Sequence, residues 1–376
     1  MTGDDAAGPE QGAGRTPDDF DPLQAEQDRA TAKSPTRRVV EAVVGLGLAV
    51  VLLVWGLPYF AKTSWADIWS VVQTIPWTSF VLYQSLMLVG LYCYTFTFTG
   101  SLRGLRHGQA LIVNLCGSSV SNLLPGGGAV GLAATYAILR SWGFTRRATS
   151  TSAIVTGVWN VMARIALPVI AIFALWVGNK DLPSALADAA VAALITGTLI
   201  LTVFIAVLAS ERAALATGAF LDKVLRPLYK GRRKTMSVTD LVRDLRNRIN
   251  DVVRHGWLPM TLGMIGFFGL YYVLFVLIMH ETGVTLPLGM LFAGFAISRV
   301  LTAVGITPGG LGVTETATSA ALVAWGADPA AATAGVVLFS LFTHIMEVPL
   351  GGLGWLLWTV SPKTEPPAEG AEPLAH

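Results

Sequence analysis

Two stretches of the sequence decide the fold: residues 122–128 read NLLPGGG, and residues 307–315 read TPGGLGVTE. Each stretch interrupts an apolar segment, the first at 109–139 and the second at 285–326. Proline and glycine together end one helix and permit a tight turn before the next. The sequence therefore predicts two re-entrant hairpins, or broken helices, that turn at these two places.

The rest of the chain is equally apolar. Hydrophobic residues make up 53% of the 376 residues and charged residues only 13%, against about 25% charged residues in soluble proteins. Runs of about 20 apolar residues can cross a bilayer as helices, whereas the strands of a membrane barrel would alternate apolar and polar residues. We expect an all-α polytopic membrane protein with two hairpins and six spanning helices, at about 39–60, 78–100, 148–177, 188–209, 257–279 and 330–358.

Two polar tails flank the membrane domain of residues 39–360. Residues 1–38 and 361–376 are too polar to bury a core, and we expect both to be disordered. Lys and Arg collect in cytoplasmic loops. Eleven basic residues lie between 211 and 256, whereas the loops of the opposite side hold only Lys62 and Lys180. The asymmetry predicts that both termini are cytoplasmic.

The two hairpins resemble one another in sequence. Shifting the sequence by 183 positions places Pro125 on Pro308, and 11 of the 24 aligned positions that begin there are identical. We infer a duplication with halves at about 76–177 and 257–358. Three spanning helices separate the hairpins, and an odd number of crossings turns the second copy over. An inverted repeat with broken helices is typical of secondary transporters; the alternative is that Pro and Gly only kink packed helices.

Few charged residues fall inside the apolar segments, where each costs about 2.5–3.5 kcal/mol on insertion scales. They are Glu41, Arg164, Arg299, Glu315 and Glu347. Glu41 lies at the start of a helix, and we expect it at the membrane interface. The other four lie deeper and are candidates for function.

Arg164 and Glu347 occupy equivalent places in the two halves. Each lies 39 residues after the proline of its own turn, so the two are candidates to face each other across a pseudo-twofold axis. Glu315 follows the second turn at the start of a half-helix, where the helix dipole favours a carboxylate or another anion. His344 shares a helix face with Glu347.

Two interpretations of these charges stay open. In the first, Arg164 and Arg299 bind a phosphate while an acidic residue or His344 gates transport by protonation. In the second, the charges form two buried ion pairs that only lock helices together. The candidate residues for substrate binding and translocation are Pro125, Gly126, Gly127, Gly128, Arg164, Arg299, Pro308, Gly309, Gly310, Gly312, Glu315, His344 and Glu347.

Segments outside the hairpins carry weaker signals. Residues 237–254 form an amphipathic basic pattern that fits either a helix on the anionic inner leaflet or a plain connector. Three tryptophans between the first two spans are placed as an outer interfacial belt: Trp65, Trp69 and Trp77. Cys93 and Cys116 lie in apolar segments and indicate neither a disulfide nor a metal site.

The pieces NLLPGG at 122–127 and PGGLGVTE at 308–315 resemble the lysylphosphatidylglycerol synthase transmembrane domain family of flippase-like proteins. The resemblance covers about residues 38–360. Members fused to an aminoacyl transferase make aminoacylated phosphatidylglycerol and move it between leaflets, whereas stand-alone members look like lipid or polyprenyl-phosphate carriers. The chain has no room for the transferase, so the resemblance implies flipping without synthesis. Residues 129–132 are apolar where relatives often carry Glu and Arg.

These features together favour a lipid flippase of a bacterial inner membrane, whose substrate is an anionic phospholipid or a polyprenyl-phosphate-linked glycolipid. The alternative is a membrane scaffold or regulator that recruits a lipid-modifying or cell-envelope enzyme through residues 211–256. A membrane-embedded enzyme is the third choice, because no nucleophile, base or metal cluster stands out. We expect no cofactor, no metal and no nucleic-acid partner; the sequence does not decide the oligomeric state.

Overall fold

The computed structural model describes residues 62–124, 127–178, 238–302 and 307–364, together with scattered positions within 51–60 and 195–219. The named elements in this part are all helical, which confirms the predicted class. In chain order they are α4 (Trp65–Val72), α5 (Trp77–Ser101), α6 (His107–Leu123), α7 (Gly127–Ser141), α8 (Arg146–Gly178), α11 (Val238–Glu281), α12 (Leu288–Leu301), η4 (Pro308–Gly310), α13 (Val313–Ala324), α14 (Pro329–Ser340), η5 (Leu341–Ile345) and α15 (Glu347–Val360).

Within the described residues, four helical segments are long and apolar enough to cross a membrane, so the protein is a multi-pass membrane protein. They are Trp77–Ser101, Arg146–Leu175, Val252–Glu281 and Pro329–Val360. Each lies where the sequence predicted a span. The predicted spans 39–60 and 188–209 lie largely outside the described residues, and Glu41 lies outside them too.

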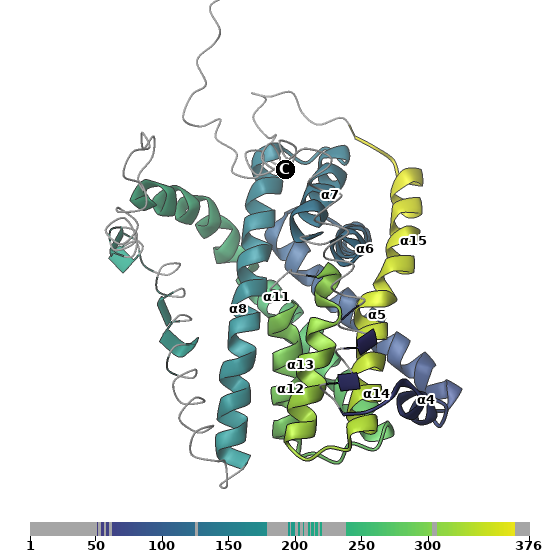
Figure 1. Cartoon of the computed structure of the whole chain (residues 1–376). Coiled ribbons are helices and arrows are strands. Elements are labelled where there is room, and N and C mark those ends of the chain that lie inside the picture. The colour runs from purple at the N-terminus through teal and green to yellow at the C-terminus, as the bar shows by residue number, and fades with distance from the viewer. Residues whose placement is uncertain are drawn as a thin grey trace, which may run out of the picture.

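The two hairpins consist of helices that are too short to span a bilayer. Their arms α6, α7, α12 and α13 have 17, 15, 14 and 12 residues, against about 20 for a spanning helix. In Figure 1, α6 and α7 lie in the upper half of the bundle, and α12 and α13 lie in the lower half. The predicted break at 308–312 is confirmed. At the first break Pro125 and Gly126 lie outside the described residues, although α6 ends just before them and α7 begins just after.

Glycines let the backbones of neighbouring helices approach closely, as is common in membrane bundles. A Cβ atom at Gly351 of α15 would lie 2.1 Å from the Cβ of Ser119 on α6 and 2.8 Å from the Leu115 carbonyl oxygen. Inside the first hairpin, a Cβ atom at Gly131 of α7 would lie 2.5 Å from the Gly117 carbonyl oxygen on α6. Helix α6 is therefore held between α7 and α15.

We predict that Gly351→Leu destabilises the protein. The new side chain would meet backbone atoms of α6 that cannot rotate away, and such overpacking costs about 1–3 kcal/mol. The measurement is the thermal unfolding of purified protein in detergent. Gly352→Leu is the matched control, since nothing lies within 4 Å of a Cβ atom at that neighbouring position; equal melting temperatures for the two variants would contradict the predicted packing.

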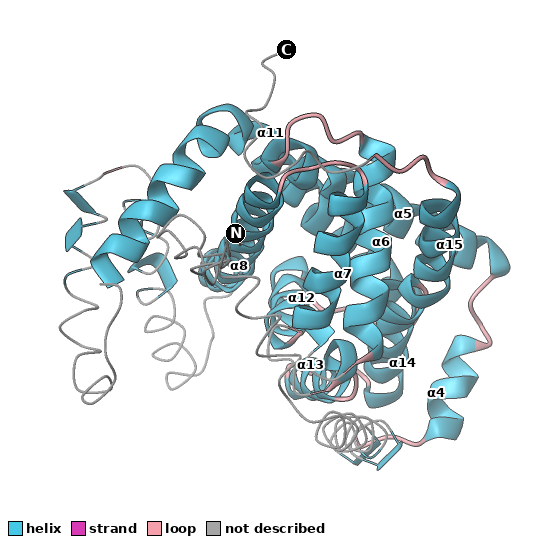
Figure 2. Cartoon of the chain, turned by 90° about the horizontal axis from the view of Figure 1, so that it is seen from above, coloured by secondary structure: helices cyan, strands magenta, loops and turns pink. Residues whose placement is uncertain are grey.

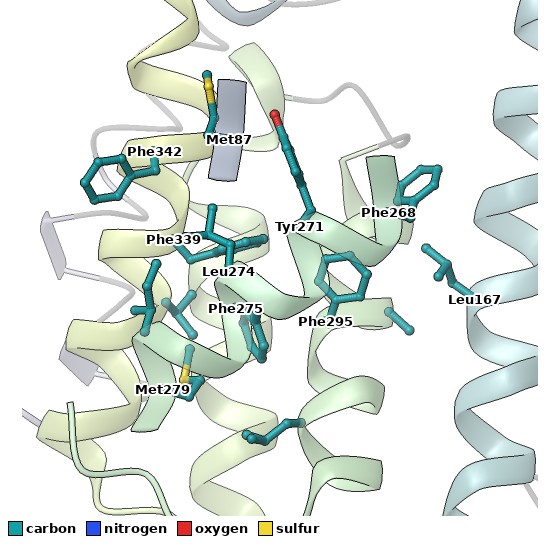
Figure 3. Packing of buried hydrophobic residues seen from close by; sticks show 14 of the residues in the cluster. Met87, Leu167, Phe268, Tyr271, Leu274, Phe275, Met279, Phe295, Phe339 and Phe342 are labelled. Atoms are coloured by element: carbon teal, nitrogen blue, oxygen red, sulfur yellow. The ribbon is translucent and has the colours of Figure 1, made fainter. Parts of the chain in front are cut away.

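The main hydrophobic core lies between α11, α12 and α14. Figure 3 shows side chains from these helices meeting one another, among them Phe275, Phe295 and Phe339. The Phe275 and Phe339 rings make an edge contact with centroids 5.0 Å apart. Tyr271 comes from the same helix as Phe275 but directs its hydroxyl group away from this cluster in the view of Figure 3.

Two helices differ from the sequence prediction. The loop after the first predicted span contains the short helix α4, which begins with a capping box between Ser64 and Asp67 and lies at the edge of the bundle in Figure 2. Helix α11 runs without a break from Val238 to Glu281, so the amphipathic segment 237–254 is part of the same helix as the span. Its first part projects sideways from the bundle in Figures 1 and 2. Most of the preceding loop lies outside the described residues.

The start of the predicted C-terminal tail is bound to the first hairpin. The Trp142 indole donates a hydrogen bond to the Ser361 hydroxyl oxygen (3.1 Å), and the Trp358 indole donates one to the Ser141 hydroxyl oxygen (2.9 Å). The backbone N–H of Thr364 donates to the Ser141 carbonyl oxygen. Residues 361–364 therefore belong to the folded part, and residues 365–376 lie outside the described residues.

Candidate functional site

The second Pro-Gly-Gly turn lies against the C-terminal end of α6. Helix α6 contacts η4 directly, and a Cβ atom at Gly309 would lie 3.0 Å from the Asn122 side-chain oxygen. Gly309, Gly310 and Gly312 have φ angles of 57°, 77° and 82°, a left-handed backbone that glycine adopts without steric cost. This geometry explains why the second turn contains three glycines. Asn122 stands at the junction between the two turns.

Arg164 lies within the span formed by α8 and binds only neutral groups. Its Nε donates a hydrogen bond to the Asn160 side-chain oxygen (2.7 Å), and an amino group of its guanidinium donates to the Arg299 carbonyl oxygen (2.6 Å). The same amino group donates to the Thr302 hydroxyl oxygen. Asn160 in turn donates to the Tyr94 hydroxyl oxygen (3.0 Å). Arg164 thus ties α8 to the C-terminal end of α12.

Arg299 is the most isolated charge of the cluster. Its side chain is 5% exposed, and its guanidinium carbon lies 4.9 Å from the centre of the Phe339 ring and 5.8 Å from that of Phe295. One amino group donates to the Ser298 hydroxyl oxygen (3.1 Å), but the buried Nε has no partner. Ring contacts and one hydroxyl group only partly replace the hydration of a buried cation.

Glu315 is bound by several donors at the start of α13. Its carboxylate accepts hydrogen bonds from the Gly312 backbone N–H (2.5 Å) and the Thr314 hydroxyl (3.0 Å). The Ser340 hydroxyl of α14 donates to its other oxygen. As the sequence predicted, Glu315 lies in the first turn of the half-helix, where the free N–H groups and the helix dipole stabilise its negative charge.

Glu347 lies directly after a π-helical turn, η5, and is contacted from two other helices. The Asn122 amide donates to the carboxylate of Glu347 (2.9 Å) and to the His344 carbonyl oxygen (3.3 Å). The Tyr271 hydroxyl of α11 donates to the other carboxylate oxygen at 3.4 Å. A π-turn leaves carbonyl groups without their usual helical partners, and Asn122 binds one of them. The first turn is therefore linked to the start of α15.

His344 extends the polar cluster toward Glu315. Its Nδ1 lies 3.2 Å from the Thr343 hydroxyl oxygen and 3.5 Å from that of Ser340. Both hydroxyl hydrogens are already used, because Ser340 donates to Glu315 and Thr343 donates to the Phe339 carbonyl oxygen. Nδ1 of His344 must then carry the hydrogen. A chain of donors runs from His344 through Ser340 to Glu315.

None of the four membrane charges forms an ion pair in the described part of the chain. Arg164 and Glu347 are not hydrogen-bonded to each other, although both lie close enough to Arg299 to interact with its charge. The interpretation of two buried ion pairs that lock helices is therefore wrong for the described residues. Arg164, Arg299, Glu315 and Glu347 each bind neutral groups instead.

The sequence identified the charges but missed their neutral partners: Tyr94, Asn122, Asn160, Tyr271 and Ser340. A polar side chain in an apolar run, such as Asn122 three residues before the first proline, was the available signal. In the first turn, Gly127 is buried whereas Gly128 and Val130 are exposed. That turn therefore gives the cluster Asn122 and no charge. Among the described residues, no group of three or more His, Cys, Asp or Glu side chains is placed to hold a metal ion.

We predict that Asn122→Ala loosens the junction between the two turns. It removes both hydrogen bonds to η5 and α15, so that the buried Glu347 carboxylate loses its amide donor at 2.9 Å, a loss of about 1–3 kcal/mol. Hydrogen–deuterium exchange should then become faster at 341–350. Asn114→Ala is the control, because the amide nitrogen of Asn114, on the same helix, has no partner. Unchanged exchange in Asn122→Ala would show that the junction does not depend on this amide.

Comparison with known proteins places this geometry in context. A family model described as "Lysylphosphatidylglycerol synthase TM region" matches residues 42–351, which include both hairpins and all four buried charges. A comparison with curated proteins finds no match.

Proposed function

Because the chain belongs to the lysylphosphatidylglycerol synthase TM family, we propose that it is a lipid flippase. Its substrate would be a phospholipid or a polyprenyl-phosphate-linked glycolipid, moved between the leaflets of a bacterial inner membrane. The observation that carries this proposal is the pair of guanidinium groups without a carboxylate partner, the half-buried Arg164 and the buried Arg299, near the contact between α6 and η4. Arginine is the residue best suited to bind a phosphate at several points.

The position of these groups fits a lipid headgroup. A buried, unpaired guanidinium is costly, and an anion that reaches it would recover much of that cost. Next to the cluster, the tip of the first hairpin is apolar and exposed: Leu123 is 56% and Val130 43% exposed. A phosphate could therefore contact the buried arginines while its hydrocarbon chain stays in the bilayer.

An inverted repeat supports transport, and the helix ends support the repeat. Under the 183-residue shift, α6 and α7 fall on α12 and α13, and α8 falls on the continuous segment α14–η5–α15. Both α7 and α13 end at a Trp-Gly pair with a left-handed glycine, Gly143 at φ 87° and Gly326 at φ 99°. Two equivalent hydrogen bonds close each helix. In α7 the backbone N–H of Phe144 donates to the Leu139 carbonyl oxygen, and in α13 that of Ala327 donates to the Leu322 carbonyl oxygen. In each helix the glycine N–H makes a second bond, to the carbonyl oxygen three residues before it.

Helix contacts follow the same exchange of halves. α6 packs on α15 and α12 packs on α8, while α5 and α11 pack on each other. Each pair maps onto its counterpart when the two halves are interchanged. Such repeats place the substrate where the broken helices meet, which here is the junction of Asn122 with Gly309 and the nearby arginines.

We predict that Arg164→Ala and Arg299→Ala each reduce lipid translocation while the protein remains folded. A charge-assisted hydrogen bond contributes about 1.5–3 kcal/mol, so a loss of roughly tenfold or more is expected. The measurement is leaflet accessibility of a fluorescent phosphatidylglycerol in proteoliposomes, with gel filtration as the test of folding. Arg103→Ala is the control, because Arg103 is exposed between α5 and α6. Wild-type protein that moves no lipid between the leaflets in this assay would refute the proposal that the protein is a flippase.

The orientation is part of the proposal. We infer from the distribution of basic residues that both termini are cytoplasmic, so that the first hairpin enters from the inside and the second from the outside. A C-terminal fusion to green fluorescent protein should fluoresce, and the equivalent fusion to alkaline phosphatase should be inactive. An active phosphatase fusion would show that the C-terminus lies on the opposite side of the membrane.

A further inference from the structure

The buried charges of the site balance one another without touching. Ionisable groups face Glu347 and the arginines beside it from the surrounding elements: His344 on η5, Tyr271 on α11, Arg299 on α12, Arg164 on α8, Tyr94 on α5 and Glu315 on α13. The phenols are neutral near pH 7, and His344 is buried with no carboxylate in contact. Counted in their ionised forms, the two arginines and two glutamates sum to a net charge of zero.

An anionic headgroup would disturb this balance. A monoanion that binds the arginines leaves the site with one excess negative charge, in surroundings where charges are weakly screened. The excess is removed if one glutamate accepts a proton as the headgroup binds. We propose that an anionic lipid headgroup binds this site together with one proton, which Glu347 accepts. This inference rests on the proposed lipid substrate and adds the coupling ion.

The hydrogen bonds distinguish the two glutamates. Glu315 accepts hydrogen bonds from a backbone N–H and from two hydroxyl groups at a helix N-terminus, so that donors occupy both of its oxygens. Glu347 has one amide donor at 2.9 Å and a phenol at 3.4 Å, with the Ser118 hydroxyl group beside it. All three donors are neutral side chains, and we therefore assign the proton to Glu347.

The partner of Glu347 is suited to both states. The Asn122 side chain is an amide, which can offer its nitrogen as a donor to a carboxylate or its oxygen as an acceptor to a carboxylic acid. Because Asn122 also binds the His344 carbonyl and lies against Gly309, such a change reaches both turns. Protonation of Glu347 is thereby linked to the contact between the two hairpins.

The coupling also fixes what drives transport. A monoanionic lipid that crosses together with one proton moves no net charge, so its flux depends on the pH gradient and not on the membrane potential. A uniporter that moved the anion alone would respond directly to the potential, at about 2.3 kcal/mol per charge and 100 mV.

The first test measures proton uptake on binding. The full chain in detergent, in weakly buffered solution with a pH indicator, is mixed with dihexanoyl phosphatidylglycerol or with a farnesyl-phosphate-linked glucose, two monoanionic phosphodiesters; dihexanoyl phosphatidylcholine, which has no net charge, is the control. We expect about one proton taken up per monoanion bound. At pH values where Glu347 is ionised in the lipid-free protein, the affinity for the anionic lipid should weaken about tenfold for each unit by which the pH rises. Binding without proton uptake would overturn the inference and leave the flippase standing.

The second test uses matched variants. Glu347→Gln should bind the same lipid with no proton uptake and with an affinity independent of pH. Glu281→Gln should behave as wild type, since Glu281 lies at the end of α11 and binds Ser79 and Tyr83 instead of the cluster. Uptake that persists in Glu347→Gln would overturn the assignment, and the pH dependence of wild-type affinity decides the coupling even if that variant does not fold.

The third test distinguishes the two levels of the proposal. Proteoliposomes of phosphatidylcholine with a fluorescent phosphatidylglycerol tracer are given either a pH gradient or a potassium diffusion potential. Acceleration by the pH gradient alone supports proton coupling. Acceleration by the potential alone would reject the coupling but keep the flippase, whereas wild-type protein that neither binds nor moves either anionic lipid would reject both.

Discussion

Hydrocarbon supplies no hydrogen-bond partner, and this constraint decides where the chain can interrupt its helices. A broken helix exposes backbone N–H and carbonyl groups that only protein or enclosed water can satisfy. The second Pro-Gly-Gly turn is accordingly enclosed, with Pro308 and Gly310 buried. Side chains bind the backbone near the breaks: Glu315 caps the half-helix after the second turn, and Asn122, at the end of α6, binds the carbonyl group freed by η5. The same enclosure that permits the breaks gathers the charges.

The two turns differ in their surroundings although their sequences align. The second turn is buried and carries Glu315, while residues after the first turn are apolar and partly exposed. An equivalent position in the two halves therefore does not have an equivalent role. Arg164 and Glu347 illustrate this, because one ties α8 to α12 and the other is held between α6 and α11. Asymmetry of this kind gives a site one polar wall and one wall open to hydrocarbon chains.

Much of the architecture could be predicted from the sequence, because run length, Pro-Gly breaks and the 183-residue shift are local or periodic signals. The short helix α4 could have been predicted as well, from Ser64 and Asp67 three residues apart. What the sequence could not supply was the pairing of the charges. Whether Arg164 lies beside Glu347 or beside Arg299 depends on how each helix is rotated about its axis. That rotation is set by contacts between segments more than 100 residues apart in the sequence. For the same reason, the sequence alone does not identify Asn122 and Tyr271 as hydrogen-bond partners of Glu347.

The close contacts at Ser119 and at Arg164 have one more consequence. The first hairpin packs on α15, the last helix of the second half, and the second hairpin packs on α8, the last helix of the first half. Each hairpin thus packs on the long helix that follows the other hairpin in the sequence. Neither half would be a complete fold by itself, since separation would uncover the interrupted backbone that the other half shields. Each hairpin is consequently packed against a helix from the other part of the chain.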